Sequence, residues 1–297
     1  MDDIRQQILR SAQGAALLHI AFVGVANHLF DSLARLGSAS AERLAQEAQR
    51  DLGYVTRWCD AAYAFELLDE RDDGVLTLTA LGAAFDTTAP GSLFAFPVST
   101  MLGAHIAERA AGLMQSGEQP GEVVLEERET LLRFFGPMLE ATFAPVFEDS
   151  VIDALPIFSE VDTRGGLAVD LGCGNGWYLR CLARRFPNLR GVGLDAFAQN
   201  IEGATERAVA EGVSGRLSFR VGDLHRFEVD EPAALIAMNR ALHHVWDHKE
   251  DVCRLLATHL RPGGAAVIWE PAWPDTRAPL REPARRVVAF QNLAEHV

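Results

Sequence analysis

From about residue 156 onward, apolar residues form short uninterrupted runs separated by longer stretches with helical periodicity. The runs are GLAVDL, GVGLD, LSFRVGD, ALIAMN and AAVIWE, and the stretches between them include GWYLRCLARRF, AQNIEGATERAVAEG and KEDVCRLLATHL. Strands without polar alternation are typical of a parallel sheet that is covered on both faces. Residues 156–297 are therefore predicted to form an α/β domain with a doubly wound, mainly parallel sheet and right-handed crossovers.

The first 85 residues follow a different pattern, which predicts helices and one small β-element. Apolar positions recur at helical spacing from Ile8 to Leu36, and Gly37 predicts the end of that stretch. Ser40 is a suitable N-cap for SASAERLAQEAQR, and DLGYVTRWCDAAYAFELL predicts a further helix before the strand VLTLT. Helices followed by a β-wing in this order are typical of a winged-helix domain.

Residues 86–155 are predicted to connect these two regions. The segments TTAPGS and SGEQPGE are turn-like, and the next stretch carries phenylalanines at roughly helical spacing: Phe134, Phe135, Phe143 and Phe147. Packing against the following domain is the simpler interpretation of these rings. The alternative is that some of them wall an apolar substrate pocket.

Charge argues against nucleic acid as a partner of the winged helix. The whole chain has a formal net charge of -14, and residues 1–90 hold 7 Arg against 13 Asp and Glu. The candidate recognition helix offers Arg57 beside Asp60 and Glu66, so it could make few phosphate contacts. Packing or dimerisation is the role expected of this domain.

The cysteines and the N-terminal segment indicate the cellular compartment expected for this protein. The four cysteines lie far apart with no C-x-x-C pair, which predicts reduced thiols and a cytoplasmic protein. The apolar run AALLHIAFVGVA is short and contains His19, so neither a signal peptide nor a membrane span is expected. Lys249 is the sole lysine beside abundant Ala and Arg, a composition typical of GC-rich bacterial genomes.

The segment VDLGCGNGWYL, residues 169–179, places three glycines directly after the first predicted strand. Open α/β sheets bind ligands at the carboxyl ends of their strands, and glycines there allow a sharp turn and a close approach to the ligand. Gly172, Gly174 and Gly176 have the spacing G-x-G-x-G. The dinucleotide fingerprint would need a further glycine at position 177, which is Trp177.

Two acidic residues follow the next two predicted strands. Asp195 ends GVGLD, 23 residues after Gly172, where a carboxylate can accept both hydroxyls of a ribose. Asp223 follows the third strand and can accept a hydrogen bond from an adenine amino group. A fourth strand, a helix, an RPGG turn and a fifth strand complete the pattern.

This combination resembles the class I S-adenosylmethionine-dependent methyltransferases over roughly residues 150–270. The resemblance implies S-adenosylmethionine as cofactor and S-adenosylhomocysteine as product. It assigns the glycine loop to the methionine part of the cofactor, the acid after strand two to ribose and the acid after strand three to adenine. The cofactor-binding residues expected here are Asp170, Gly172, Gly174, Gly176, Asp195, Asp223, Leu224 and Asn239.

A winged helix ahead of such a domain resembles the small-molecule O-methyltransferases of bacterial natural-product and plant phenolic pathways. The resemblance implies a homodimer formed through the N-terminal domain and a hydroxylated, partly aromatic metabolite as methyl acceptor. Leu242-His243 matches the Leu-His pair whose histidine is the family's base. The family usually continues with an acid and tryptophan, whereas His244 and Val245 stand here, so a structural histidine at a helix start is the alternative for His243.

Several alternatives stay open at this point. His243, His244 and His248 could suggest a metal site, but no Glu or Cys completes a known pattern, so a solvated histidine cluster and no metal are expected. A transcription regulator that senses the cofactor, or an enzyme that uses the cofactor without methyl transfer, would also fit the motifs.

The C-terminal segment departs from the family. Its sheet normally continues after strand five with a helix and an antiparallel hairpin, whereas residues 271–297 predict a Pro-rich turn and one amphipathic helix. Either the chain is cut short and lacks the hairpin, or the fifth strand ends the sheet and a neighbour covers its edge.

Overall fold

The structure, a computed structural model, describes residues 2–71, 73–117 and 129–295. The chain divides into two compact units, Met1–Ala104 and His105–Val297. The division lies within the connecting region expected at 86–155 and inside helix α6 (Ala95–Ser116). The expected limits of three regions, at residues 85 and 155, therefore stay predictions.

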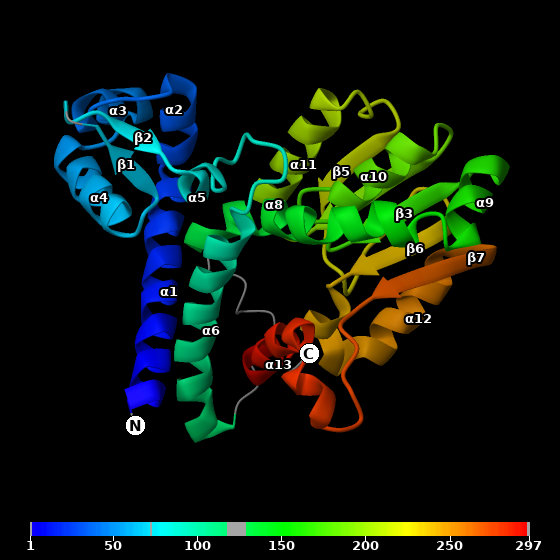
Figure 1. The fold of residues 1–297 in the computed structure, drawn as a ribbon. Coiled ribbons are helices and arrows are strands. Elements are labelled where there is room, and N and C mark those ends of the chain that lie inside the picture. The colour runs from blue at the N-terminus through cyan, green and yellow to red at the C-terminus, as the bar shows by residue number, and fades with distance from the viewer. Residues whose placement is uncertain (1, 72, 118–128, 296–297) are drawn as a thin grey trace. The chain divides into compact units, whose positions relative to one another are not determined.

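The first unit is helical with one small antiparallel hairpin (Figure 1). Its elements are α1 (Asp2–Ala26), α2 (Leu29–Leu36), α3 (Ala41–Ala48), α4 (Leu52–Ala64), β1 (Leu68–Glu70), β2 (Leu76–Leu78) and α5 (Ala80–Ala83). Gly37 ends α2 with a φ of 73°, and the Ser40 side chain accepts a hydrogen bond from the Arg43 backbone N–H at the start of α3. The end of α2 and the start of α3 therefore lie where the sequence predicts them.

Helix α1 is long, apolar and largely exposed. By length and composition alone it could cross a membrane, yet only 17% of its most apolar window is buried. Its C-terminal end packs closely, because a Cβ at Gly24 would lie 2.3 Å from the Phe30 ring. Ile4 and Ile8 at the other end are 63% and 62% exposed. The expectation of no membrane partner stays a prediction.

The second unit is built on a five-stranded parallel sheet in the order β5-β4-β3-β6-β7. Its strands are β3 (Leu167–Leu171), β4 (Arg190–Asp195), β5 (Leu217–Val221), β6 (Ala233–Asn239) and β7 (Leu260–Trp269). The prediction of a doubly wound parallel sheet is confirmed. Strand β7 begins earlier than AAVIWE, since Leu260 already pairs with Ala233 before an irregularity in the ladder.

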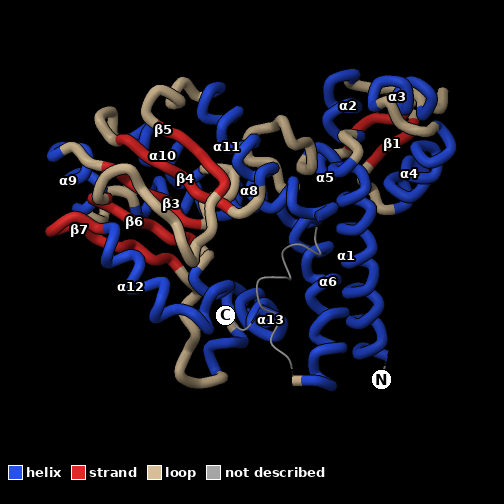
Figure 2. The backbone as a smooth tube through the Cα atoms, turned by 180° about the vertical axis from the view of Figure 1, so that it is seen from behind, coloured by secondary structure: helices blue, strands red, loops and turns tan. Residues whose placement is uncertain are grey.

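Helices cover both faces of this sheet (Figure 2). Residues of α9 (Pro156–Arg164), α10 (Trp177–Arg185) and α11 (Ala198–Ala210) share a core with the π-helical turn η1 (Phe147–Val151). Residues of the 3-10 helix η2 (Leu242–His248) and α12 (Lys249–His259) form a second core. Adjacent strand residues face opposite cores, as Ala168 and Val169 do, which explains why β3 is apolar at nearly every position.

An aromatic cluster dominates the first of these cores. Helix α8 (Glu129–Val146) leads into Phe147, which is fully buried. Its ring lies 5.7 Å from that of Phe158 and 5.9 Å from that of Trp177, both in edge-on contact. Phe147 thus belongs to the core, as the simpler interpretation of this phenylalanine-rich stretch expects.

The last described elements are the 3-10 turn η3 (Ala278–Arg281) and helix α13 (Pro283–Glu295). Within the described part of the chain, which reaches residue 295, no strand follows Trp269. A turn and one helix in this segment agree with the pattern of the sequence.

Candidate cofactor site and active site

The glycine loop leaves β3 at its carboxyl end and turns through left-handed backbone conformations. The φ angles are 72° at Gly172, 53° at Gly174 and 74° at Gly176. A Cβ at Gly172 would lie 2.8 Å from that of Ala241, and one at Gly176 would lie 2.6 Å from the Phe219 ring. Both the backbone angle and the available space therefore require glycine at these two positions.

Asp195, at the end of β4, holds this loop from one side. Its Oδ2 accepts a hydrogen bond from the Gly174 N–H at 2.9 Å, and its Oδ1 accepts from Phe197 N and Asn200 Nδ2, each at 3.0 Å. Burial raises the pKa of this carboxyl, although the hydrogen bonds oppose the shift. Asp195 thus ties the end of β4 to the glycine loop and to the start of α11.

A cavity of about 1120 Å³ lies at the carboxyl ends of these strands. Six of the predicted cofactor residues line it: Gly172, Gly174, Asp195, Asp223, Leu224 and Asn239. Asp170, Gly176 and His243 are not on its wall, whereas His244 is. Phe135 and Leu139, one turn apart on α8, add an apolar stretch of wall, so one of the four phenylalanines does face the cavity.

Asp223 is half-buried at the cavity edge, and its carboxylate is bound by groups of its own loop. Its Oδ1 accepts from the His225 N–H at 2.9 Å, and its Oδ2 lies 3.0 Å from Arg226 Nε. The Arg226 side chain is 84% exposed, so this ion pair is screened and weak. Each carboxylate oxygen keeps a lone pair for a donor such as an amino group.

Asp170 lies behind the loop and not on the wall. It is fully buried, and its Oδ1 accepts a hydrogen bond from Asn239 Nδ2 at 3.0 Å. Burial raises the pKa of Asp170 to about 8, the charge of Asp195 adds to the shift, and the Asn239 bond opposes it. Asn239 Oδ1 is buried and has no hydrogen-bond partner among the described residues. Asn239 lines the cavity, so a hydrogen-bond donor bound there could pair with this oxygen.

Arg240 follows Asn239 and adopts a left-handed backbone, with a φ of 57°. Its N–H donates to the Trp269 carbonyl at 2.9 Å, which stabilises this turn at the end of β6. Non-glycine residues rarely adopt this conformation, and those that do cluster at functional sites. The sequence contains no signal for this feature.

His243 is buried beside a carboxylate that the sequence analysis did not single out. Its Nδ1 lies 2.8 Å from Glu270 Oε2, and Glu270 Oε1 accepts from the Leu242 N–H at 2.7 Å. Burial raises the pKa of Glu270, but the hydrogen bond and charge of His243 outweigh it and hold that pKa below its ordinary value. An ionised Glu270 requires a proton on Nδ1, which leaves Nε2 of the neutral ring as an acceptor. Nε2 is buried and has no hydrogen-bond partner among the described residues.

The other reactive side chains that the structure describes do not form a metal site. No group of three or more His, Cys, Asp or Glu residues among those described could hold a metal ion. All four cysteines are free, and Cys173 and Cys181 are buried. Burial raises the pKa of the Cys181 thiol to about 12, so it stays protonated and inert at neutral pH.

Comparison with known proteins bears directly on this arrangement. Residues 168–264 match a methyltransferase domain family. An O-methyltransferase from Streptomyces lavendulae, SfmM3, is 24% identical over 254 residues, which cover 82% of this chain and 72% of the relative. Trans-aconitate 2-methyltransferase from Deinococcus radiodurans is 36% identical over 104 residues, which are 35% of this chain and 37% of the relative.

The chain carries a class I S-adenosylmethionine-dependent methyltransferase domain. The fold of this methyltransferase agrees with solved structures. Human N-acetylserotonin methyltransferase, in complex with S-adenosylmethionine, superposes with a TM-score of 0.70 at 18% identity, covering 99% of this chain and 87% of that one. The predicted family, fold class and cofactor are confirmed.

The residues present fit this cofactor. Its ribose hydroxyls and its ammonium group are donors, and the cavity offers the Asp195 carboxylate and the orphaned Asn239 Oδ1 as acceptors. When bound, S-adenosylmethionine supplies a methyl group made electrophilic by the sulfonium. The roles of the individual residues toward it stay predictions.

Proposed function

We propose that this methyltransferase methylates a hydroxyl group of a small, partly aromatic metabolite and that His243 is the general base. The observation that carries the proposal is the His243–Glu270 pair, 2.8 Å apart, together with the acceptor at Nε2. His243 follows β6, between the cavity-lining residues Ala241 and His244, and Glu270 follows the neighbouring strand β7. A histidine that only started a helix would not need a carboxylate hydrogen-bonded to its Nδ1.

In this proposal, His243 Nε2 would accept the proton of the substrate hydroxyl while the hydroxyl oxygen takes the methyl group that S-adenosylmethionine would supply. The carbon–sulfur bond would break in the same step and S-adenosylhomocysteine would leave. The Glu270 carboxylate holds the ring in the productive tautomer and stabilises the imidazolium that forms, while the hydroxyl oxygen becomes the ether oxygen. Imidazole, with an ordinary pKa of about 6.5, suits a phenol near 10 when the two groups are held in place. Phe135 and Leu139 would provide the apolar contact for an aromatic ring.

The names of the relatives support an oxygen acceptor. SfmM3 is named as an O-methyltransferase, and the trans-aconitate enzymes are named for a carboxylic acid. A carboxylate is ionised at neutral pH and needs no base, whereas a phenol does. The His243–Glu270 pair therefore favours the hydroxyl.

The first test is calorimetric titration with S-adenosylhomocysteine, with NADH as the competing ligand. We expect micromolar binding to the wild type and at least tenfold weaker binding to Asp195→Ala, roughly 1.4 kcal/mol. A panel of phenols, carboxylic acids and amines then identifies the acceptor. His243→Ala and Glu270→Gln should lower kcat for a phenol by about 10²-fold or more and leave the S-adenosylhomocysteine affinity unchanged. Full activity of His243→Ala on every accepted phenol would refute the role of the base.

We further propose that the N-terminal unit forms a homodimer, and that the enzyme is cytoplasmic without nucleic-acid or membrane partners. The exposed apolar residues Ile4 and Ile8 on α1 support a protein interface, and the net charge of -14 disfavours phosphate surfaces. Light scattering behind size exclusion should give twice the chain mass for the wild type and one chain mass for Ile8→Glu. Binding to lipid vesicles by a monomeric wild type would overturn this proposal.

A further inference from the structure

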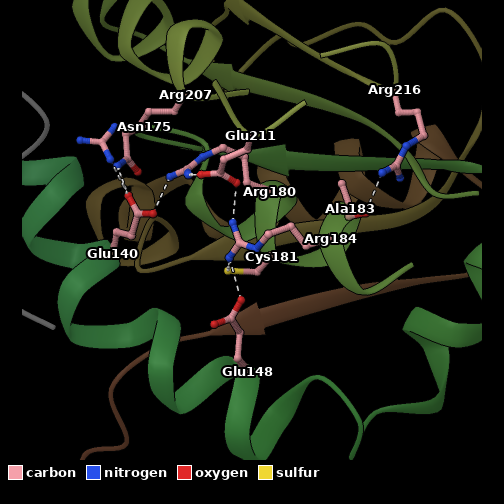
Figure 3. Close-up of polar contacts among 10 residues, drawn as sticks. All are labelled: Glu140, Glu148, Asn175, Arg180, Cys181, Ala183, Arg184, Arg207, Glu211 and Arg216. Atoms are coloured by element: carbon pink, nitrogen blue, oxygen red, sulfur yellow. Dashed lines mark hydrogen bonds and ion pairs between the residues drawn. The ribbon is translucent and has the colours of Figure 1, made fainter. Parts of the chain in front are cut away.

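Helix α8 touches the glycine loop through two residues one turn apart, Gly136 and Glu140. A Cβ at Gly136 would lie 2.8 Å from the Cβ of Asn175, so only glycine lets the helix approach the loop this closely. Glu140 Oε2 accepts a hydrogen bond from Asn175 Nδ2 at 2.6 Å (Figure 3). Asn175 is 4% exposed and stands between Gly174 and Gly176.

Glu140 is itself held in place by a buried cation. Arg180 is fully buried, and its Nη2 donates to Glu140 Oε1 at 2.7 Å, while its Nη1 pairs with Glu211 (Figure 3). Arg207 Nη1 lies 3.3 Å from Glu140 Oε2. A buried guanidinium must keep its carboxylate partners, because an unpaired charge in this position costs several kcal/mol. The orientation of the Glu140 carboxylate is therefore fixed by groups outside the loop.

The loop needs such external supports because its own sequence provides little rigidity. Gly172, Gly174 and Gly176 can each adopt many backbone conformations, so holding them in one costs conformational entropy. Asp195 holds Gly174 from the side of the sheet, and Glu140 holds Asn175 from the side of α8. The two carboxylates fix neighbouring residues of the loop from different elements.

We propose that Glu140 and Gly136 are positioning residues that act through Asn175 to hold the glycine loop in the conformation that binds the cofactor. Neither Gly136 nor Glu140 belongs to the proposed base pair, His243 and Glu270. Substitutions that disturb their contact with Asn175 should therefore change the affinity for the cofactor. Because the loop faces the amino-acid part of the cofactor in the assignment above, the effect should be largest for ligands that carry that part.

The test compares two matched pairs of variants. Gly136→Ala adds a methyl group against Asn175, whereas Gly112→Ala adds one to a helical glycine of α6 with no atom within 4 Å. Asn175→Ala removes the bond to Glu140 without touching Arg180. Glu148→Gln removes an ion pair with Arg184, 2.7 Å long, in the same network but away from the loop. Titration with S-adenosylhomocysteine and with 5′-methylthioadenosine, which lacks the amino-acid part, gives the affinities, and urea unfolding gives the stabilities.

We expect Asn175→Ala and Gly136→Ala to bind S-adenosylhomocysteine about tenfold more weakly and 5′-methylthioadenosine within about threefold of the wild type. Gly112→Ala and Glu148→Gln should bind both ligands as the wild type does. Unchanged S-adenosylhomocysteine affinity in both Asn175→Ala and Gly136→Ala would overturn the proposal. An equal loss for the two ligands would also overturn it, because that result indicates a general loss of folded structure.

Discussion

Replacing the buried carboxyl of Asp170 with the amide of Asn should change how the stability of the second unit depends on pH. Burial raises the pKa of Asp170 to about 8 from an ordinary 3.8, mainly because the ionised form loses its water. The folded protein therefore keeps this proton to about pH 8, while the unfolded chain releases it near pH 4. Between these values the folded state binds more protons, so its stability falls as pH rises.

The size of the effect follows from the shift. One pKa unit corresponds to 1.36 kcal/mol, so the full shift of about four units amounts to roughly 6 kcal/mol between pH 4 and pH 8. Between pH 5.5 and pH 7.5, where measurement is practical, the wild type should lose roughly 2–3 kcal/mol relative to Asp170→Asn. The Asn side chain can still accept the hydrogen bond from Asn239, so the variant differs mainly in the missing ionisation.

The assay is urea unfolding without cofactor at pH 5.5, 6.5 and 7.5, followed by tryptophan fluorescence. A Trp58→Phe background removes the tryptophan of the first unit, so that the remaining four report on the second. Asp230→Asn, at a side chain that is 91% exposed, is the control and should leave the wild-type pH profile unchanged. A difference between wild type and Asp170→Asn that stays constant over this range would show that Asp170 is ionised in the folded protein, and the argument from burial would be wrong.

Three further predictions concern the core, the loop and the buried pair. Phe147→Ala should lower the free energy of unfolding by about 3–5 kcal/mol in urea titrations, because the ring is fully buried among other aromatics. Gly176→Ala should destabilise by more than about 1 kcal/mol, since it combines a φ of 74° with a contact to the Phe219 ring, whereas Gly215→Ala, with no atom within 4 Å, should stay within about 0.5 kcal/mol. Glu270 has a lowered pKa, so the stability it contributes is present above its ordinary pKa of 4.5 and is lost as pH falls. The difference in unfolding free energy between wild type and Glu270→Gln should shrink from pH 6 to pH 3.5. A difference that stayed constant over this range would contradict a lowered pKa of Glu270 in the folded protein.

The parts of the site that sequence reasoning located are those defined by local pattern. Apolar runs in the sequence predict the strands of a parallel sheet. The carboxyl ends of these strands lie at one edge of the sheet, so the residues that follow them must lie near one another. Gly172, Asp195 and Asp223 line one cavity for this reason. The position of Gly37 at the end of a helix is equally local, since it depends on a φ angle that glycine adopts readily.

The parts that were missed depend on pairs of residues far apart in the chain. Glu270 meets His243 across 27 positions because β6 and β7 are neighbours in the sheet. Glu140 meets Asn175 across 35 positions because Gly136 lets α8 approach the loop. Glutamates are common on helices and after strands, so nothing in the sequence separates these two from solvated ones.

The sequence by itself determined the fold class, the glycine loop and the acidic residues after the strands, because periodicity and spacing are local properties that act over a few residues. The cofactor followed from the resemblance of this combination of motifs to a known methyltransferase family. Only the tertiary structure decided that Asp170 is buried with a raised pKa, that His243 has a carboxylate partner and that α8 contacts the glycine loop. Burial and pairing are properties of the packed chain, since water is excluded and distant side chains meet only after the elements have assembled.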